Sequence, residues 1–360
     1  MFGGSQLLPR FPASPLPHTF APMPDALRIL AIRFSSIGDI LLTTPLLRAI
    51  RARYPAATLA MLTKESFTPL VVDNPRLNEV IGFKPAQRLE QLAADLRKRE
   101  FTHVMDLHGS LRSRALRILV PGPRWSGYRN HRVAREILIR YKRNTYPRDI
   151  PVPERYFDAA RGLDVRPDGE PPEFFLAQAS RDEAAAWLAA ADLPLDGSVV
   201  ALAPGAAHNT KRWPLEYWQD LARRLTATRI SVVTVGGPGD VEAAQAVADA
   251  GGPAAVNAAG RFGLQGTGAL LARCRALVSG DTGVMHMATG VGTPVVALFG
   301  PTVRPFGFFP YSRKAIVLER DLDCRPCTAH GSEVCPLGHH HCLRQIAPPE
   351  VEDVLRRLVA

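Results

Sequence analysis

Short β-rich runs alternate with helical stretches along most of this chain, and the alternation restricts the fold more than any other feature of the sequence. In the first half, β-rich runs lie at 28–34, 58–64, 79–83 and 102–107. Between them, apolar residues recur every three or four positions at 41–53, 67–72 and 88–99, the period of a helix with one buried face. This order predicts a parallel sheet with right-handed crossover connections.

The pattern starts again after a proline-rich, polar stretch at 166–172. Further β-rich runs follow at 199–203, 230–235, 276–279 and 295–299, and predicted helices begin at Pro214 and span 241–250 and 283–290. We therefore predict an α/β fold of two Rossmann-like, doubly wound domains that face a central cleft. Residues 27–172 form the predicted first domain and residues 173–360 the second.

Composition is consistent with two globular domains. The 360 residues are 46% hydrophobic and 22% charged, and no apolar run approaches the roughly 20 residues that cross a bilayer. Residues 1–26 are rich in proline and show neither the long apolar run nor the small-residue cleavage site of a signal peptide. We predict that they are a disordered extension and that Met23 is the true start.

The formal net charge is +10 at pH 7, and much of the excess lies at 112–148, where Glu136 is the only acid. The basic residues of this segment are Arg112, Arg114, Arg117, Arg124, Arg129, Arg132, Arg135, Arg140, Lys142, Arg143 and Arg148. A basic field attracts anions, so the segment predicts an acidic or phosphorylated partner. An ordinary solvated surface rich in arginine is the alternative.

Ligands of doubly wound sheets bind beyond the carboxyl ends of the strands. The loop after the first predicted strand reads FSSIGD, which places Gly38 in a tight turn and Asp39 at the start of a helix. A carboxylate there caps free backbone amides, and capping favours its charged form. The ionised group also has the chemistry of a general base, provided that an acceptor hydroxyl comes within hydrogen-bonding reach.

Two loops of the second half suit a diphosphate. The loop PGAAHNTKRWP carries the adjacent cations Lys211 and Arg212 before a helix start, although the same residues also suit an ordinary surface loop. The loop GDTGVMH offers helix-start amides and the Thr282 hydroxyl. Asp281 would repel phosphate, so we expect it to cap the helix, orient a neighbour or accept from a sugar hydroxyl. His286 is either a packed histidine or a ligand contact.

The motifs FSSIGDILLTTP, PGAAHNTKRWP, GDTGVMHMATGVGTPVVALFGPT and the tail CRPC with CPLGHHHC together resemble glycosyltransferase family nine, the ADP-heptose:lipopolysaccharide heptosyltransferases. The resemblance runs from about residue 27 to the C-terminus. It implies the GT-B architecture, in which the N-terminal half takes the acceptor and the C-terminal half binds the nucleotide sugar.

The resemblance also implies site residues. Asp39 matches the catalytic base, and Lys211 matches the lysine that contacts the donor phosphates. The predicted donor contacts are Gly38, Lys211, Asp281, Thr282, Gly283 and His286, and the predicted acceptor contacts are Arg33, Ser35 and Ser36. The implied reaction is an inverting single displacement that moves heptose from ADP-heptose to the lipid A-Kdo inner core of lipopolysaccharide, with no cofactor required.

Four of the five cysteines cluster in the tail, as Cys324, Cys327, Cys335 and Cys342. A C-x2-C pair followed by two further cysteines has the ligands for a structural zinc ion, but the spacing is looser than in a standard zinc ribbon. Reduced thiols are the alternative for an intracellular protein. Cys274 stands apart and is predicted to lie in the core.

Other functions remain open on the sequence alone. They are a family-related transferase with another sugar donor, a nucleotide-sugar epimerase or hydrolase on the same scaffold, and a basic zinc-containing module for nucleic acid. Aromatic residues interleaved with the basic ones, which typify nucleic-acid binding, are sparse here. We expect a cytoplasmic enzyme that binds no nucleic acid and attaches peripherally to the cytoplasmic face of the inner membrane through its basic segment.

Overall fold

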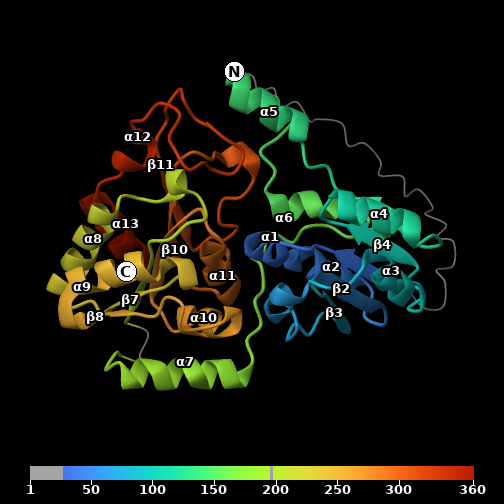
Figure 1. The fold of residues 1–360 in the computed structure, drawn as a ribbon, viewed down its shortest axis with the longest axis horizontal. Helices are drawn as coiled ribbons and strands as arrows, with labels where there is room; N and C mark the ends of the chain where they lie inside the picture. The colour runs from blue at the N-terminus through green and yellow to red at the C-terminus, as the bar shows by residue number, and fades with distance from the viewer. Residues whose placement is uncertain (1–26, 195–197) are drawn as a thin grey trace, which may run out of the picture.

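The computed structural model describes residues 27–194 and 198–360, and the predicted disordered extension lies outside them. Two parallel sheets lie side by side (Figure 1). The first has the order β3-β2-β1-β4-β5, with β1 Arg28–Ile32, β2 Thr58–Lys64, β3 Glu79–Phe83, β4 His103–Asp106 and β5 Arg124–Gly127. The second has the order β11-β10-β9-β6-β7-β8, with β6 Val200–Ala203, β7 Val232–Thr234, β8 Ala255–Asn257, β9 Ala276–Gly280, β10 Val295–Phe299 and β11 Ala315–Glu319.

Helices connect the strands in both halves. The first half contains α1 Ile37–Leu41, α2 Thr44–Arg53, α3 Leu89–Arg97, α4 Leu111–Leu119, α5 Arg132–Tyr141 and α6 Val152–Arg155, with 3-10 helices η1 Glu65–Leu70 and η2 Tyr156–Leu163. The second contains α7 Gln178–Ala190, α8 Leu215–Ala227, α9 Val241–Gly251, α10 Leu264–Leu271, α11 Gly283–Val291, α12 His341–Arg344 and α13 Pro348–Val359, with 3-10 helices η3 Asn209–Lys211, η4 Pro238–Asp240, η5 Gly252–Ala254 and η6 Arg304–Phe306. This is the predicted α/β fold of two doubly wound sheets.

Each sheet has one point at which the chain reverses its direction of strand addition. In the first sheet, β1 lies beside β4, and in the second, β6 lies beside β9. A crevice opens at such a switch point, because the loops after the two neighbouring strands leave in opposite directions. The loops after β1, β6 and β9 are the three that sequence motifs marked, so the topology itself selects them.

Two predicted helices differ from the observed ones. The helix expected at 41–53 is divided into α1 and α2, and Pro45 stands in the first turn of α2, where its missing amide costs least. The hydroxyls of Thr43 and Thr44 donate to the carbonyl oxygens of Ile40 and Leu41, each at 2.7 Å. The helix expected at 67–72 is the 3-10 helix η1, which holds Pro69 within it.

The two halves meet where α1 crosses α11. A Cβ atom added to Gly38 would lie 2.3 Å from Cδ2 of His286, and one added to Gly283 would lie 2.8 Å from Cβ of Ile37. Only glycine permits so close an approach of two backbones. One buried apolar cluster, which includes Ile29 of the first half and Leu277 of the second, runs through both halves.

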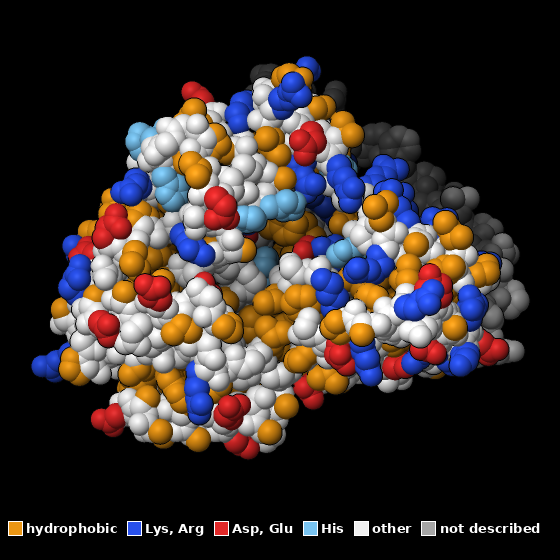
Figure 2. All heavy atoms as spheres, viewed as in Figure 1, with side chains coloured by type: hydrophobic (Ala, Val, Ile, Leu, Met, Phe, Trp, Pro, Cys, Tyr) orange, Lys and Arg blue, Asp and Glu red, His pale blue; other side chains and the backbone are white. Residues whose placement is uncertain are grey.

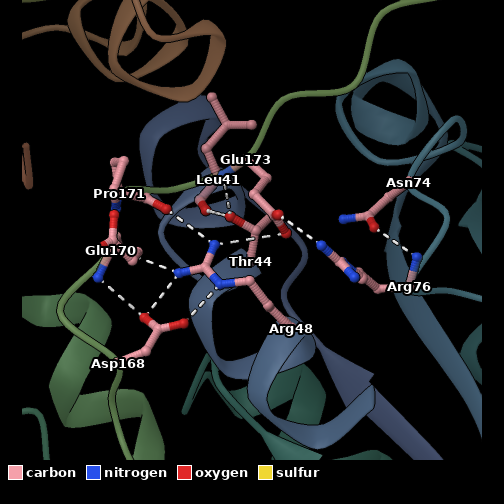
Figure 3. A network of polar contacts seen from close by, with 9 residues as sticks. All are labelled: Leu41, Thr44, Arg48, Asn74, Arg76, Asp168, Glu170, Pro171 and Glu173. Atoms are coloured by element: carbon pink, nitrogen blue, oxygen red, sulfur yellow. Dashed lines mark hydrogen bonds and ion pairs between the residues drawn. The ribbon is translucent and has the colours of Figure 1, made fainter. Parts of the chain in front are cut away.

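The segment between the halves is held by charged side chains (Figure 3). Arg48 on α2 forms two hydrogen bonds of 2.8 Å with the carboxylate of Asp168, and Thr44 Oγ1 accepts from the Glu173 amide at 2.8 Å. From Phe174 onward the segment contacts the second half instead of the first, since the Phe174 amide donates to the carbonyl oxygen of Gly290 at 2.8 Å. The predicted boundary after residue 172 stays a prediction, one residue before this change.

Among the helices of the described residues, none has the length and apolar character needed to span a bilayer.

Candidate active site

One cavity of about 530 Å³ lies between the two halves, at both switch points. Figure 2 shows the hollow between them, with histidine side chains at its walls. Of the residues predicted for the site, those that line the cavity are Arg33, Ser36, Gly38, Asp39, Lys211, Asp281, Thr282, Gly283 and His286. Ser35 is not among the lining residues; its carbonyl oxygen accepts a hydrogen bond from Arg33 Nε at 2.7 Å. The structure thus brings three loops far apart in sequence to one place.

Asp39 lies in the first turn of α1 and is held from two sides. Its Oδ2 accepts from the Ser36 hydroxyl at 2.9 Å and from the Ser36 amide at 3.3 Å, so it does cap the helix. Its Oδ1 lies 2.7 Å from Arg33 Nη2, and the side chain is 17% exposed. Burial works to raise the pKa of Asp39, but the Arg33 guanidinium and the Ser36 hydrogen bonds outweigh it and hold that pKa below the ordinary value. The carboxylate is therefore ionised, oriented and open to the cavity.

Arg33 lines the cavity and also fixes the loop after β1. Besides Asp39 and the Ser35 carbonyl, its Nη1 donates to the carbonyl oxygen of Leu107 at 2.6 Å, which ties the loop after β1 to the loop after β4. Tyr156, from η2, lies beneath both groups: its hydroxyl is 3.5 Å from Asp39 Oδ1 and its ring centroid 5.9 Å from the guanidinium. Tyr156 is fully buried, and no motif in the sequence pointed to it. The role predicted for Arg33, acceptor contact, stays a prediction.

Lys211 and Asp281 form an ion pair on the opposite wall. Lys211 Nζ lies 2.7 Å from Asp281 Oδ2, and the two side chains are 15% and 10% exposed. The Thr302 hydroxyl donates to the same oxygen at 2.8 Å. Asp281 is thereby neutralised, which removes the objection that it would repel a phosphate. Arg212, the second cation of the predicted cradle, is exposed, does not line the cavity, and donates to the Ala206 carbonyl at 3.0 Å.

The start of α11 faces the same cavity. Thr282 is its N-terminal capping residue and Gly283 its first residue, so free backbone amides and the positive end of the helix dipole lie at the cavity wall. Behind them, His286 is 4% exposed and packs on Gly38. Burial lowers the pKa of His286 below its ordinary value, although the nearby carboxylates of Asp281 and Asp39 act to raise it. The ring is neutral at physiological pH and joins the two walls as a packed side chain.

Sequence motifs missed several residues that line the cavity. His108 follows β4, and burial, aided by Arg33, lowers its pKa to about 4. Arg132 and Arg135 enter from α5, within the basic segment. A signal for His108 existed, because its loop follows the strand that neighbours β1 at the switch point.

The cysteine-rich tail also reaches the cavity, through Ala329 and His330. The Thr210 amide donates to the Ser332 carbonyl at 3.0 Å, and the Ser332 amide donates to Thr210 Oγ1 at 2.8 Å. These two hydrogen bonds hold the tail against the loop that carries Lys211. From the first half, Lys142 Nζ donates to the carbonyl oxygens of Cys324 at 3.0 Å and Pro326 at 2.6 Å. The tail thus packs against both halves beside the site.

The structure does not support the predicted zinc site. Within residues 27–194 and 198–360, no group of three or more His, Cys, Asp or Glu side chains is arranged to hold a metal ion, and Cys324, Cys327, Cys335 and Cys342 are free thiols. Burial raises the pKa of Cys342 to about 11, so this sulfur stays protonated at neutral pH. Cys274 lies in the core as predicted.

A second cavity of about 700 Å³ lies within the N-terminal half and adjoins the first cavity. The two share the lining residues Tyr128, Asn130 and Arg132. The second cavity is rich in guanidinium groups, from Arg114, Arg117, Arg129 and Arg132. The basic segment seen in the sequence therefore forms the wall of a space that leads toward Asp39.

Two Rossmann-like halves with an ionised carboxylate on one wall of their cleft, and a cation beside a helix start on the other, define an enzyme of the GT-B glycosyltransferase architecture. Residues 89–337 match the model of glycosyltransferase family 9 (heptosyltransferase). The chain belongs to this family and is a glycosyl-transferring enzyme.

Relatives and solved structures extend the match over nearly the whole chain. Lipopolysaccharide heptosyltransferase 2 of Salmonella typhimurium is 26% identical over 93% of this chain and 99% of its own length. Lipopolysaccharide heptosyltransferase 1 of Pseudomonas aeruginosa is 27% identical over 84% of this chain and 86% of its own. The structure of ADP-heptose LPS heptosyltransferase II of Escherichia coli superposes with a TM-score of 0.73, at 26% identity, over 92% of this chain and 98% of that one.

Proposed function

We propose that this enzyme transfers heptose from ADP-heptose to the inner core of lipopolysaccharide, on a lipid A-Kdo acceptor. The names of the similar heptosyltransferases support this donor and acceptor. The observation that carries the proposal is the placement of Asp39 and of the Lys211–α11 cradle on facing walls of one cavity.

The proposed reaction is a single displacement. The acceptor hydroxyl oxygen attacks the anomeric carbon while its proton passes to Asp39, and the bond between that carbon and the diphosphate oxygen breaks to release ADP. Attack from the side opposite the leaving group inverts the anomeric configuration. The Asp39 carboxylate suits this step because it is ionised, fixed by Arg33 and Ser36, and reachable from the cavity.

The leaving diphosphate gains charge as the bond breaks, and the opposite wall supplies preorganised positive charge. Lys211 and the backbone amides of Thr282 and Gly283 would donate hydrogen bonds to the phosphate oxygens. Asp281 would keep Lys211 in place and accept from a sugar hydroxyl. Since this wall belongs to the C-terminal half, we assign the donor to that half and the acceptor to the other.

The arginine-lined second cavity is the proposed path of the acceptor. Core lipopolysaccharide precursors carry phosphates and acidic sugars, and guanidinium groups bind both in bidentate fashion. Arg114, Arg117 and Arg129 would hold these anions while the acceptor hydroxyl reaches Asp39. Such an acceptor resides in a membrane, so we propose peripheral attachment to the cytoplasmic face of the inner membrane.

A donor comparison tests the proposal. ADP-heptose should raise the melting temperature of the protein more than ADP-, UDP- and GDP-hexoses do, and product NMR should show an inverted anomeric carbon. A nucleotide-sugar epimerase or hydrolase would consume ADP-heptose without acceptor. Such consumption at the rate of the complete reaction would contradict a transferase.

A further inference from the structure

Helices α4 and α5 expose large apolar side chains on the N-terminal half. Leu111 and Ile118 on α4 are 83% and 80% exposed, and Val133 and Tyr141 on α5 are 74% and 67% exposed. Leu111 and Ile118 are seven residues apart, so they lie on one face of α4. Single exposed apolar residues are common on soluble proteins, so these four gain significance from the charge and the cavity that the same two helices carry.

The same two helices carry exposed positive charge. Their exposed arginines are Arg112, Arg114, Arg117, Arg132 and Arg140. None of these five has a carboxylate within ion-pairing distance among the residues that the structure describes. Figure 2 shows basic side chains gathered on the α4 and α5 side of the cleft, with apolar side chains among them. The surface therefore combines apolar area with uncompensated charge.

The two helices flank one opening. Arg114 and Arg117 of α4 and Arg132 and Val133 of α5 line the second cavity, and Arg132 Nη2 donates to the carbonyl oxygen of Gly109, just before α4, at 3.3 Å. The cavity continues into the one that holds Asp39. An anionic headgroup inside it would lie beside two helices that also carry the exposed apolar residues, of which Val133 itself lines the cavity.

We propose that α4 and α5 form the membrane-docking face of this enzyme, with Leu111, Ile118, Val133 and Tyr141 entering the interface of a bilayer that contains acidic phospholipid. The inference rests on the proposed function and names the surface that brings the acceptor to the site. Apolar side chains on one face of a basic helix are the pattern of interfacial membrane binding. A second copy of the chain would bring like charges together, and three of the four exposed apolar side chains are aliphatic and offer nucleic-acid bases nothing to stack on.

Co-sedimentation of the full chain with vesicles tests the docking face. The wild-type protein should bind vesicles of phosphatidylglycerol and phosphatidylethanolamine and stay in the supernatant with phosphatidylcholine alone. Leu111→Ser, Ile118→Ser and Tyr141→Ser in one variant should weaken the partition coefficient about tenfold or more, since three apolar contacts with the interface are lost.

A matched control removes apolar residues that are exposed on other elements, through Val72→Ser, Leu215→Ser and Val241→Ser. This control should bind acidic vesicles as the wild type does. Both variants should keep the melting temperature within a few degrees, because the substituted side chains are exposed. Equal vesicle binding by the two triple variants, wild-type binding that is no stronger on acidic than on neutral vesicles, or a dimer that only the α4–α5 variant abolishes would overturn the proposal.

Transfer to an acceptor stripped of its acyl chains separates this inference from the proposed function. The α4–α5 variant should transfer heptose to that water-soluble acceptor at the wild-type rate and lose rate only with acceptor embedded in acidic vesicles. Transfer to the soluble acceptor with no vesicle binding by the wild type would refute the docking face and leave the function standing. Failure of transfer to both acceptors would refute the function instead.

Discussion

The two walls of the cleft treat charge in opposite ways. On the wall that we propose for the donor, Lys211 and Asp281 neutralise each other at 2.7 Å, in a setting where both side chains are at least 85% buried. On the wall that we propose for the acceptor, four arginines line the second cavity, and the one carboxylate among its described lining residues, that of Asp106, accepts from the Ser113 hydroxyl at 2.7 Å and from loop amides.

The difference indicates two kinds of recognition. In a buried ion pair the two charges balance each other, so its cation is released only to a ligand that takes over the pairing. An exposed group of unpaired arginines attracts anions of many shapes, and salt weakens that attraction. We therefore expect the donor wall to bind its ligand with high selectivity. The acceptor wall should bind a broader range of anions, and its affinity should depend on ionic strength.

The largest effect should come from Asp39→Asn. The amide keeps the size of the side chain but accepts no proton, so kcat should fall about 10²- to 10⁴-fold. ADP affinity, measured by calorimetry, should stay within about twofold, since the donor wall is untouched. A kcat within tenfold of wild type would show that another group takes the proton.

Lys211→Ala should act on the donor wall alone. Loss of a charged hydrogen bond to phosphate should weaken ADP binding about 10- to 100-fold, while the KM of the acceptor changes little. Because Asp281 is then left as an unpaired carboxylate facing the phosphates, Lys211→Ala with Asp281→Asn should bind ADP more tightly than Lys211→Ala. A double variant no better than the single one would show that Asp281 plays no part in the charge balance.

Arg114→Gln with Arg117→Gln should act on the acceptor wall. At low salt we expect the KM of the acceptor to rise about tenfold, with ADP affinity unchanged. Titration with NaCl gives the sharper test: salt should weaken acceptor binding in the wild type more steeply than in the variant. Parallel salt curves would mean that these guanidinium groups do not meet the acceptor anion.

The smallest effect concerns pH. The pKa of Asp39 lies below its ordinary value of 3.8, so the carboxylate is charged throughout the neutral range and kcat/KM should be almost flat from about pH 5.5 to 7.5 on its account. The stability that this charge contributes is present above the unfolded pKa and is lost only as the pH falls through the folded pKa, below pH 3.8.

Arg33→Met sharpens that test. With the guanidinium removed, burial dominates, the pKa of Asp39 rises, and the acid limb of the kcat/KM profile should move to higher pH. An unshifted acid limb in this variant would mean that Asp39 does not control it.

Much of the site could be predicted because its loops follow strands directly. Gly38, Asp39, Lys211, Thr282 and Gly283 each lie within a few residues of a strand end or a helix start, so local order alone places them at the carboxyl edge of a sheet. The division of the helix at Pro45 was also readable from the missing proline amide, although the sequence interpretation ran the helix through it.

Other parts of the site depend on contacts between segments far apart in the chain. Tyr156 reaches Asp39 across 117 positions, and Ser332 bonds to Thr210 across 122. No periodicity or motif encodes such pairs, because they exist only once the helices and loops have packed. The zinc interpretation of the tail finds no support in residues 27–194 and 198–360, for a related reason: cysteine spacing says which ligands are near in sequence, whereas metal binding needs them gathered in space.

The sequence by itself determined the two parallel sheets, the loops that bear the chemistry and the excess of positive charge on one segment, because alternation, strand ends and charge are local properties. Tertiary structure alone decided that Arg33 holds Asp39, that Lys211 is balanced by Asp281, and that His286 packs on Gly38 where the halves meet. The physical reason is that pairing of charges and close backbone contact depend on distance in space, which the order of residues constrains only through the completed fold.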